Sequence, residues 1–183
     1  MKGFLLLILF FLTESMLAQD FNTGLNRFIK EQDSIRQTYI GKKYPAFVSV
    51  TMEGDTISEK MLPGKVTFLN FWFETCAPCI AEFEELKSMY ERYKDDQNFQ
   101  FISFTTDSYT DAKKTVRKYK LPYKVCHISR DYASKMNFNQ GFPTNIVIDK
   151  KGNVVFLKAG GATDQERVKK AIKEIDDIIA KNL

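Results

Sequence analysis

The stretch Val66-Thr-Phe-Leu-Asn-Phe-Trp-Phe-Glu-Thr-Cys76-Ala-Pro-Cys79-Ile-Ala-Glu82 decides how the rest of the sequence is interpreted. It begins with an apolar run that ends at Trp72 and Phe73, passes through two cysteines with two residues between them, and continues with helical spacing. This order predicts a buried strand that leads into a helix at a thiol pair.

The two cysteines have different expected roles. Cys76 stands at the start of the predicted helix, where unpaired backbone N–H groups and the helix dipole stabilise a thiolate, so it is the expected nucleophile. Cys79 follows three residues later on the same helical face, where it can close a disulfide with Cys76 and expel a bound substrate. Pro78 falls in the first turn, where its missing N–H removes no helical bond.

Two other interpretations of the cysteine pair are disfavoured. A zinc site needs a second Cys/His pair, but the chain offers only Cys126 and His127, which are expected on opposite faces of a short strand. Cys126 is therefore expected to be a small buried residue and His127 a structural one. An inert structural disulfide is disfavoured because a strand–turn–helix setting is typical of a redox pair. No metal or other cofactor is expected.

The N-terminus predicts export. Lys2 precedes an apolar run from Phe4 to Leu12, and Ala18 is a small residue suited to cleavage, which together indicate a secretory signal peptide over residues 1–18. The run is short for a membrane span. Residues 19–40 are expected to form a leader segment and residues 41–183 a single domain.

The charge pattern excludes a nucleic-acid partner. The net charge is +4, and a cluster of lysines and arginines within residues 113–124 has the spacing of a solvated helix face. No set of aromatic side chains suited to base stacking accompanies it.

Outside the cysteine stretch, the periodicity predicts a hairpin around Gly54-Asp55 and alternating helices and strands after it. One expected helix runs from the cysteines to about Lys94, and two more cover about residues 111–119 and 131–136. The expected strands cover residues 99–105, about 123–128, 145–148 and 154–158. A last helix is expected to open with the capping box Thr163-Asp-Gln-Glu166.

Several further motifs accompany the cysteine pair: Gly41-Lys-Lys-Tyr-Pro45-Ala-Phe47, Leu69-Asn-Phe-Trp72, Glu82-Phe83, and Gly141-Phe-Pro143-Thr144. With these motifs the chain resembles the thioredoxin superfamily and, more narrowly, the exported ResA/TlpA-like thiol-disulfide oxidoreductases, over about residues 40–179. The resemblance implies an α/β, thioredoxin-like fold with a central mixed β-sheet flanked by helices. It also implies an N-terminal β-hairpin and an insertion between the two halves that holds the short helix near Asp131.

The resemblance also implies site residues. Pro143 matches the family's cis-proline, which faces the cysteines, and the backbone of Phe142 is expected to pair with an extended substrate segment. The expected substrate contacts surround the pair: Trp72, Thr75, Ala77, Pro78 and Phe142. Thr75 departs from the family, which often carries a tryptophan there, and this alters the surface offered to substrates.

Glu82 is the expected proton carrier. Thioredoxin has a buried aspartate on its central strand, but Asn70 stands at the matching position and cannot take a proton. Glu82 lies three residues after Cys79, and its side chain leans toward the thiols, as does the active-site glutamate of the ResA-like group. A solvated helix position is the alternative for Glu82, and Glu74 is a second possible base.

The function implied is that of an exported, periplasmic thiol-disulfide oxidoreductase acting as a reductant on protein disulfides. By resemblance, its partners include apocytochrome c, in cytochrome c maturation, and a membrane electron-donor oxidoreductase that recharges it. Two alternatives stay open, a copper-binding chaperone of the same fold and a thiol peroxidase. The first usually has three residues between its cysteines, and the second needs a proline and threonine context that is missing around Cys76.

Overall fold

The structure is a computed structural model that describes residues 23–24, 26–27, 30 and 33–183. The signal peptide expected over residues 1–18 lies outside the described residues, and part of the expected leader segment does too. Within that segment, residues 33–39 are helical. The larger of the two compact units of the chain runs from Tyr39 to Leu183. Within the described part of the chain, no helix has the length and apolar character that crossing a membrane requires.

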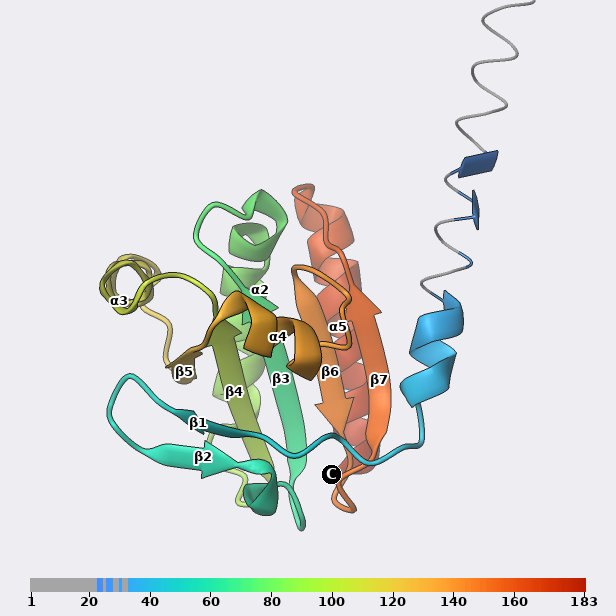
Figure 1. Ribbon diagram of the computed structural model, residues 1–183, viewed down its shortest axis with the longest axis horizontal. Helices are drawn as coiled ribbons and strands as arrows, with labels where there is room; N and C mark the ends of the chain where they lie inside the picture. The colour runs from blue at the N-terminus through green and yellow to red at the C-terminus, as the bar shows by residue number, and fades with distance from the viewer. Residues whose placement is uncertain (1–22, 25, 28–29, 31–32) are drawn as a thin grey trace, which may run out of the picture. The chain divides into compact units, whose positions relative to one another are not determined.

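A five-stranded sheet in the order β5, β4, β3, β6, β7 forms the centre of this unit (Figure 1). Its strands are β3 (Val66–Trp72), β4 (Phe99–Thr105), β5 (Lys124–His127), β6 (Thr144–Ile148) and β7 (Val154–Ala159). The sheet is mixed, since β3 pairs in parallel with β4 and antiparallel with β6. All seven residues of β3 are buried, because this central strand is covered on both faces.

Helices and a hairpin cover the two faces of the sheet (Figure 1). The covering elements are α2 (Ala77–Tyr93) and α5 (Gln165–Asn182) on one face, and β1 (Val48–Val50), β2 (Thr56–Ser58) and α4 (Arg130–Met136) on the other. The remaining elements are η1 (Glu59–Met61) and α3 (Tyr109–Tyr119), which precedes β5. Each face has its own apolar layer, one built around Phe68 and Trp72 and the other around Leu69 and Phe71.

The predicted fold class is confirmed. The sheet is mixed and flanked by helices, β1 and β2 form an antiparallel hairpin ahead of it, and α4 lies in the connection between β5 and β6. The Phe142–Pro143 peptide bond is cis, as the resemblance implied.

The predicted start of the last helix is wrong by one residue. Asp164, not Thr163, is the N-cap of α5, and its carboxylate accepts a hydrogen bond from the backbone N–H of Arg167 at 3.0 Å. Aspartate and threonine both suit this position, and the negative charge of aspartate gains additionally from the positive end of the helix dipole. The expected capping box between Thr163 and Glu166 is therefore replaced by a single aspartate cap.

Candidate active site

The two cysteines lie where β3 passes into α2, and they form a disulfide with a Cα–Cα distance of 5.2 Å. Cys76 is the N-cap of α2, and its sulfur accepts a hydrogen bond from the backbone N–H of Cys79 at 3.3 Å. Once the disulfide is reduced, the same N–H and the helix dipole stabilise a thiolate at Cys76.

Local sequence explains this arrangement. A backbone hydrogen bond from the N–H of Cys76 to the carbonyl of Phe73, 3.1 Å long, closes the turn after β3. Pro78 occupies the first turn of α2, which contains no acidic residue that would oppose a thiolate. Cys76 is 6% exposed and Cys79 only 1%, so a client reaches the sulfur of Cys76 first.

Glu82 lies on the buried face of α2, one turn after Cys79, with 1% of its surface exposed. Its Oε2 accepts a hydrogen bond from Nδ2 of Asn145 at 3.1 Å. Burial raises the pKa of Glu82 from its ordinary 4.5 to about 7, although the Asn145 hydrogen bond and the Lys158 ammonium both act to lower it. A carboxyl group with this pKa both gives and takes protons at neutral pH.

Gly161, in the loop between β7 and α5, shows where Glu82 and Pro143 meet. A β-carbon placed on Gly161 would lie 2.9 Å from Cγ of Pro143, 3.1 Å from Oε1 of Glu82 and 3.1 Å from Cβ of Pro78. The three groups therefore surround one point, although they come from segments far apart in the sequence. Since Pro78 lies between the two cysteines, Oε1 of Glu82 borders the face of the protein that carries the disulfide.

Comparison with known proteins identifies the family of this chain. The AhpC/TSA family matches residues 40–157. This chain belongs to the AhpC/TSA family. Over 132 residues it is 36% identical to the thiol-disulfide oxidoreductase ResA of Bacillus anthracis, a match that covers 69% of this chain and 73% of that protein.

Solved structures show the same fold. A thiol:disulfide interchange protein from a Bacteroides species has a TM-score of 0.63 and 23% identity, and the match covers 77% of this chain and 90% of the other. The thioredoxin domain of a thiol-disulfide oxidoreductase from Bacteroides vulgatus has a TM-score of 0.60 and 24% identity, covering 74% and 96%. Its curated relatives are named for this activity, and this AhpC/TSA family member is an enzyme of the thiol-disulfide oxidoreductase class.

The other expected contact residues divide into two groups. Thr75 and Ala77 are exposed, and Pro78 and Phe142 are half-buried, so all four lie at the surface around the disulfide. Trp72 is fully buried, and its Nε1 donates inward to Oγ of Ser103 at 2.7 Å. A side chain without exposed surface does not touch a client, so Trp72 is no longer a candidate substrate contact.

Cys126 and His127 take no part in this site. Cys126 is fully buried on β5, and burial raises the pKa of its thiol to about 12, so it is not a thiolate at neutral pH. His127 points to the opposite face and is exposed. Across the residues that the structure describes, no three His, Cys, Asp or Glu side chains are grouped so as to hold a metal ion.

Glu74 differs from Glu82 in its surroundings. It is exposed, its backbone N–H donates to Asp107 at 2.8 Å, and its carboxylate accepts from the hydroxyl of Thr115 at 3.4 Å. It therefore lacks the burial that raises the pKa of Glu82.

Sequence reasoning missed four residues of the site. Asn145 and Gly161 contact Glu82 as described, Phe73 packs edge-on against Phe142 with ring centroids 5.3 Å apart, and the guanidinium of Arg130 lies 5.8 Å from the centre of the Phe73 ring. One signal was available for Asn145, because it is an amide inside the otherwise apolar run of β6, two residues after Pro143.

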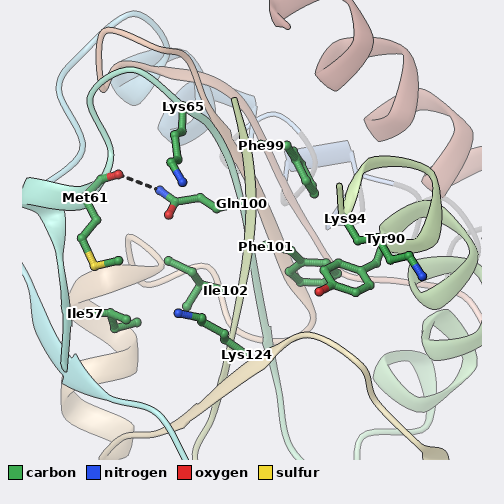
Figure 2. A pocket seen from close by; sticks show the side chains of 10 residues that line it. All are labelled: Ile57, Met61, Lys65, Tyr90, Lys94, Phe99, Gln100, Phe101, Ile102 and Lys124. Atoms are coloured by element: carbon green, nitrogen blue, oxygen red, sulfur yellow. Dashed lines mark hydrogen bonds between the residues drawn. The ribbon is translucent and has the colours of Figure 1, made fainter. Parts of the chain in front are cut away.

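A cavity of about 210 Å³ lies elsewhere, at the edge of β4 (Figure 2). Figure 2 shows Lys65, Lys94 and Lys124 among its lining residues, with the rings of Phe101 and Tyr90 beside each other. None of its lining residues belongs to the disulfide site. The candidate active site is instead a surface with a nearly buried disulfide, a form suited to a protein client rather than to an enclosed small molecule.

Proposed function

We propose that the protein is an exported, periplasmic reductant of protein disulfides, with Cys76 as nucleophile, Cys79 as resolving thiol and Glu82 as proton carrier. The observation that carries this proposal is the buried carboxyl group of Glu82 beside Pro78 and Pro143, with a pKa of about 7. Its partial negative charge opposes thiolate formation at the neighbouring sulfurs. Stabilised thiolates make a protein a strong oxidant, so a site that disfavours them is a reducing one.

The reaction begins with the reduced enzyme. The thiolate of Cys76 attacks one sulfur of the client disulfide, the client S–S bond breaks, and a mixed disulfide forms between Cys76 and the client. The first client sulfur leaves as a thiolate and takes a proton. Thr75, Ala77, Pro78 and Phe142 surround this step, and the backbone of Phe142 pairs with the extended client segment.

The second step releases the client. The carboxylate of Glu82 takes the proton of Cys79, and the Cys79 thiolate attacks Sγ of Cys76. The mixed disulfide breaks, the second client thiolate leaves and receives the proton from Glu82, and the Cys76–Cys79 disulfide forms again. Two electrons have then passed to the client, and a membrane electron-donor oxidoreductase is needed to restore the dithiol.

Client trapping tests the proposal. A Cys79→Ala variant expressed in the native cell retains a mixed disulfide on Cys76, because the resolving thiol is gone, and mass spectrometry identifies the bound proteins. Cys76→Ala is the matched control and retains none. Apocytochrome c is the client we expect by family resemblance, and a trapped set without any cytochrome sequence would refute that assignment.

The direction of electron flow has its own test. Equilibration with glutathione is expected to give a reduction potential below about −200 mV, on the side of thioredoxin at about −270 mV. A potential near the roughly −120 mV of a strong oxidase would refute the reductant role.

Export is tested by fractionation. The full chain is expected in the periplasmic fraction with a mature N-terminus after Ala18, and a variant without residues 1–18 is expected to stay in the cytoplasm. Recovery of the intact N-terminus from the cytoplasm would overturn this proposal.

A further inference from the structure

Three buried polar side chains form a row across the middle of the sheet. Asn70 on β3 is paired in register with Ser103 on β4 and with Asn145 on β6, and each of the three is at most 2% exposed. Along β3, Phe68 and Trp72 flank Asn70 on the same face, and both belong to the apolar layer under α2 and α5. A polar row inside an apolar layer requires that every member finds a hydrogen-bond partner.

The row is part of a continuous chain of hydrogen bonds with Trp72 at one end and Glu82 at the other. Nε1 of Trp72 lies 2.7 Å from Oγ of Ser103, which lies 3.3 Å from Oδ1 of Asn70. Nδ2 of Asn70 lies 2.8 Å from Oδ1 of Asn145, and Nδ2 of Asn145 lies 3.1 Å from Oε2 of Glu82.

Chemistry determines the direction of this chain. The carboxylate of Glu82 has no hydrogen to donate, so Asn145 presents its N–H₂ to Glu82 and its Oδ1 to Asn70. Asn70 therefore donates from Nδ2 to Asn145, and its Oδ1 accepts the hydrogen of the Ser103 hydroxyl. The indole of Trp72 has an N–H and no acceptor, and the oxygen of Ser103 accepts from it, so one orientation of the two amides satisfies both ends of the chain of hydrogen bonds.

The far end of the chain distinguishes the two oxygens of Glu82. Oε2 receives the Asn145 N–H, and a protonated carboxyl group accepts best at its carbonyl oxygen, so the proton belongs on Oε1. Oε1 is also the oxygen beside Pro78, Pro143 and Gly161, at the face that carries the disulfide.

We propose that Trp72, Ser103, Asn70 and Asn145 are positioning residues that confine proton uptake and release by Glu82 to Oε1. They act through Glu82 and do not touch the client. The proposal rests on the proposed role of Glu82 as the proton carrier. It also gives Asn70, at the position where thioredoxin has a proton-binding aspartate, a different part in the same proton transfer.

Other charges act on Glu82 as well. The Lys158 ammonium on β7 lowers its pKa, and the phenol of Tyr123, in the segment before β5, interacts with its charge. Cys76 and Cys79 are the titratable groups at the start of the same helix. Titration of the oxidised protein removes the thiols from this set, because disulfide sulfurs do not bind protons in this range.

The test is a titration of the Glu82 carboxyl group, followed by ¹³C NMR in the oxidised protein. Asn145→Ala removes a hydrogen bond to a charged group and is expected to raise the pKa of Glu82 by roughly 1 to 2 pH units. Ser103→Ala leaves Oδ1 of Asn70 without its donor, so both amides can flip when Glu82 is protonated and its hydroxyl can donate to Oδ1 of Asn145. This additional stabilisation of the protonated form predicts a smaller rise in the pKa of Glu82. Ser103→Thr keeps the hydroxyl and is expected to keep the wild-type pKa.

Thr67→Val is the matched control. Thr67 is a fully buried β3 residue whose hydroxyl accepts from Gln100 at 2.7 Å and lies on the other face of the sheet. Its replacement removes a buried hydroxyl that is not part of the chain of hydrogen bonds from Trp72 to Glu82, so the pKa of Glu82 should not change. A purely structural role would lower the stability of all these variants and leave the pKa unchanged.

Two outcomes overturn the proposal: an unchanged pKa of Glu82 in both Asn145→Ala and Ser103→Ala, or an equal rise in Thr67→Val. If Asn145→Ala does not fold, the pair Ser103→Ala and Ser103→Thr decides alone. The titration requires no turnover, so it is independent of the proposed function. If Glu82→Gln turns over client disulfides at the wild-type rate, the proposed proton relay through Glu82 is refuted. If turnover depends on Glu82 but the pKa of Glu82 is unchanged in Asn145→Ala and Ser103→Ala, only the proposed positioning role is refuted.

Discussion

Replacing Glu82 by glutamine tests the most consequential feature of the site, a carboxyl group tuned by burial. Glutamine has the same shape, cannot ionise, and keeps an oxygen that accepts the hydrogen bond from Asn145. The fold should therefore be retained while the charge and the proton are removed.

The structure gives the magnitude of the effect on stability. The pKa of Glu82 rises from 4.5 to about 7 on folding, chiefly because burial disfavours the charged form. A displacement of roughly 2.5 pH units corresponds to about 3 kcal/mol at 1.36 kcal/mol per unit.

The sign follows from proton binding. Between about pH 4.5 and 7 the folded protein keeps a proton on Glu82 that the unfolded chain has already released. The contribution is therefore fully present below pH 4.5 and is lost as the pH rises through about 7. Glu82→Gln lacks this loss, so relative to wild type it should become more stable by about 3 kcal/mol between pH 4 and pH 8.5.

The assay is urea denaturation of both oxidised proteins across this range, with the disulfide intact so that no thiol titrates. The quantity of interest is the difference between the two free energies of unfolding at each pH, because other titrating groups cancel in it. A difference that stays constant from pH 4 to pH 8.5 would refute the reasoning, since Glu82 would then titrate as a solvated helix residue.

The same variant has a kinetic consequence in the reduced protein. Without the carboxylate, the pKa of Cys76 should fall, because a nearby negative charge is gone. Resolution by Cys79 should slow by about 10²–10⁴-fold, the usual contribution of a general base, and the mixed disulfide should accumulate. Unchanged thiol titration together with wild-type turnover would leave Glu74 or water as the proton acceptor.

The remaining predictions concern the other residues of the site. Alkylation of the folded, oxidised protein should label no cysteine, because Cys126 is buried, and reduction should expose Cys76 and Cys79 only; a bridge between Cys76 and Cys126 would contradict the assignment. In the reduced protein, iodoacetamide near neutral pH should label Cys76 before Cys79, and the opposite order would reverse their roles. Gly161→Ala puts a methyl group 2.9 Å from Cγ of Pro143, so we expect the free energy of unfolding to fall by roughly 1–3 kcal/mol and client turnover to slow. Denaturation and disulfide-reduction assays measure the two effects. Unchanged values in both assays would show that the site accommodates the methyl group.

The sequence alone determined the features that depend on local chemistry. The apolar run before Cys76, Pro78 in the first turn and the spacing to Cys79 specify a strand, a helix start and a thiol at that start, because capping and helix geometry act within a few residues. Periodicity likewise located the strand over residues 99–105 without error. At residues 163 and 164 two suitable caps are adjacent, and local chemistry alone did not decide between them.

The tertiary structure decided the rest, because burial and long-range contact have no local signature. Trp72 was expected at the client surface, yet the sheet and α2 enclose it and turn its indole N–H toward Ser103. Helical spacing alone did not distinguish Glu82 from a solvated helix residue, and only the family resemblance singled it out. In the structure, β6 brings Asn145 to its carboxyl group and the surrounding layer raises its pKa. A pKa depends on the dielectric and the charges around a group, and segments more than sixty positions apart in the sequence supply them here.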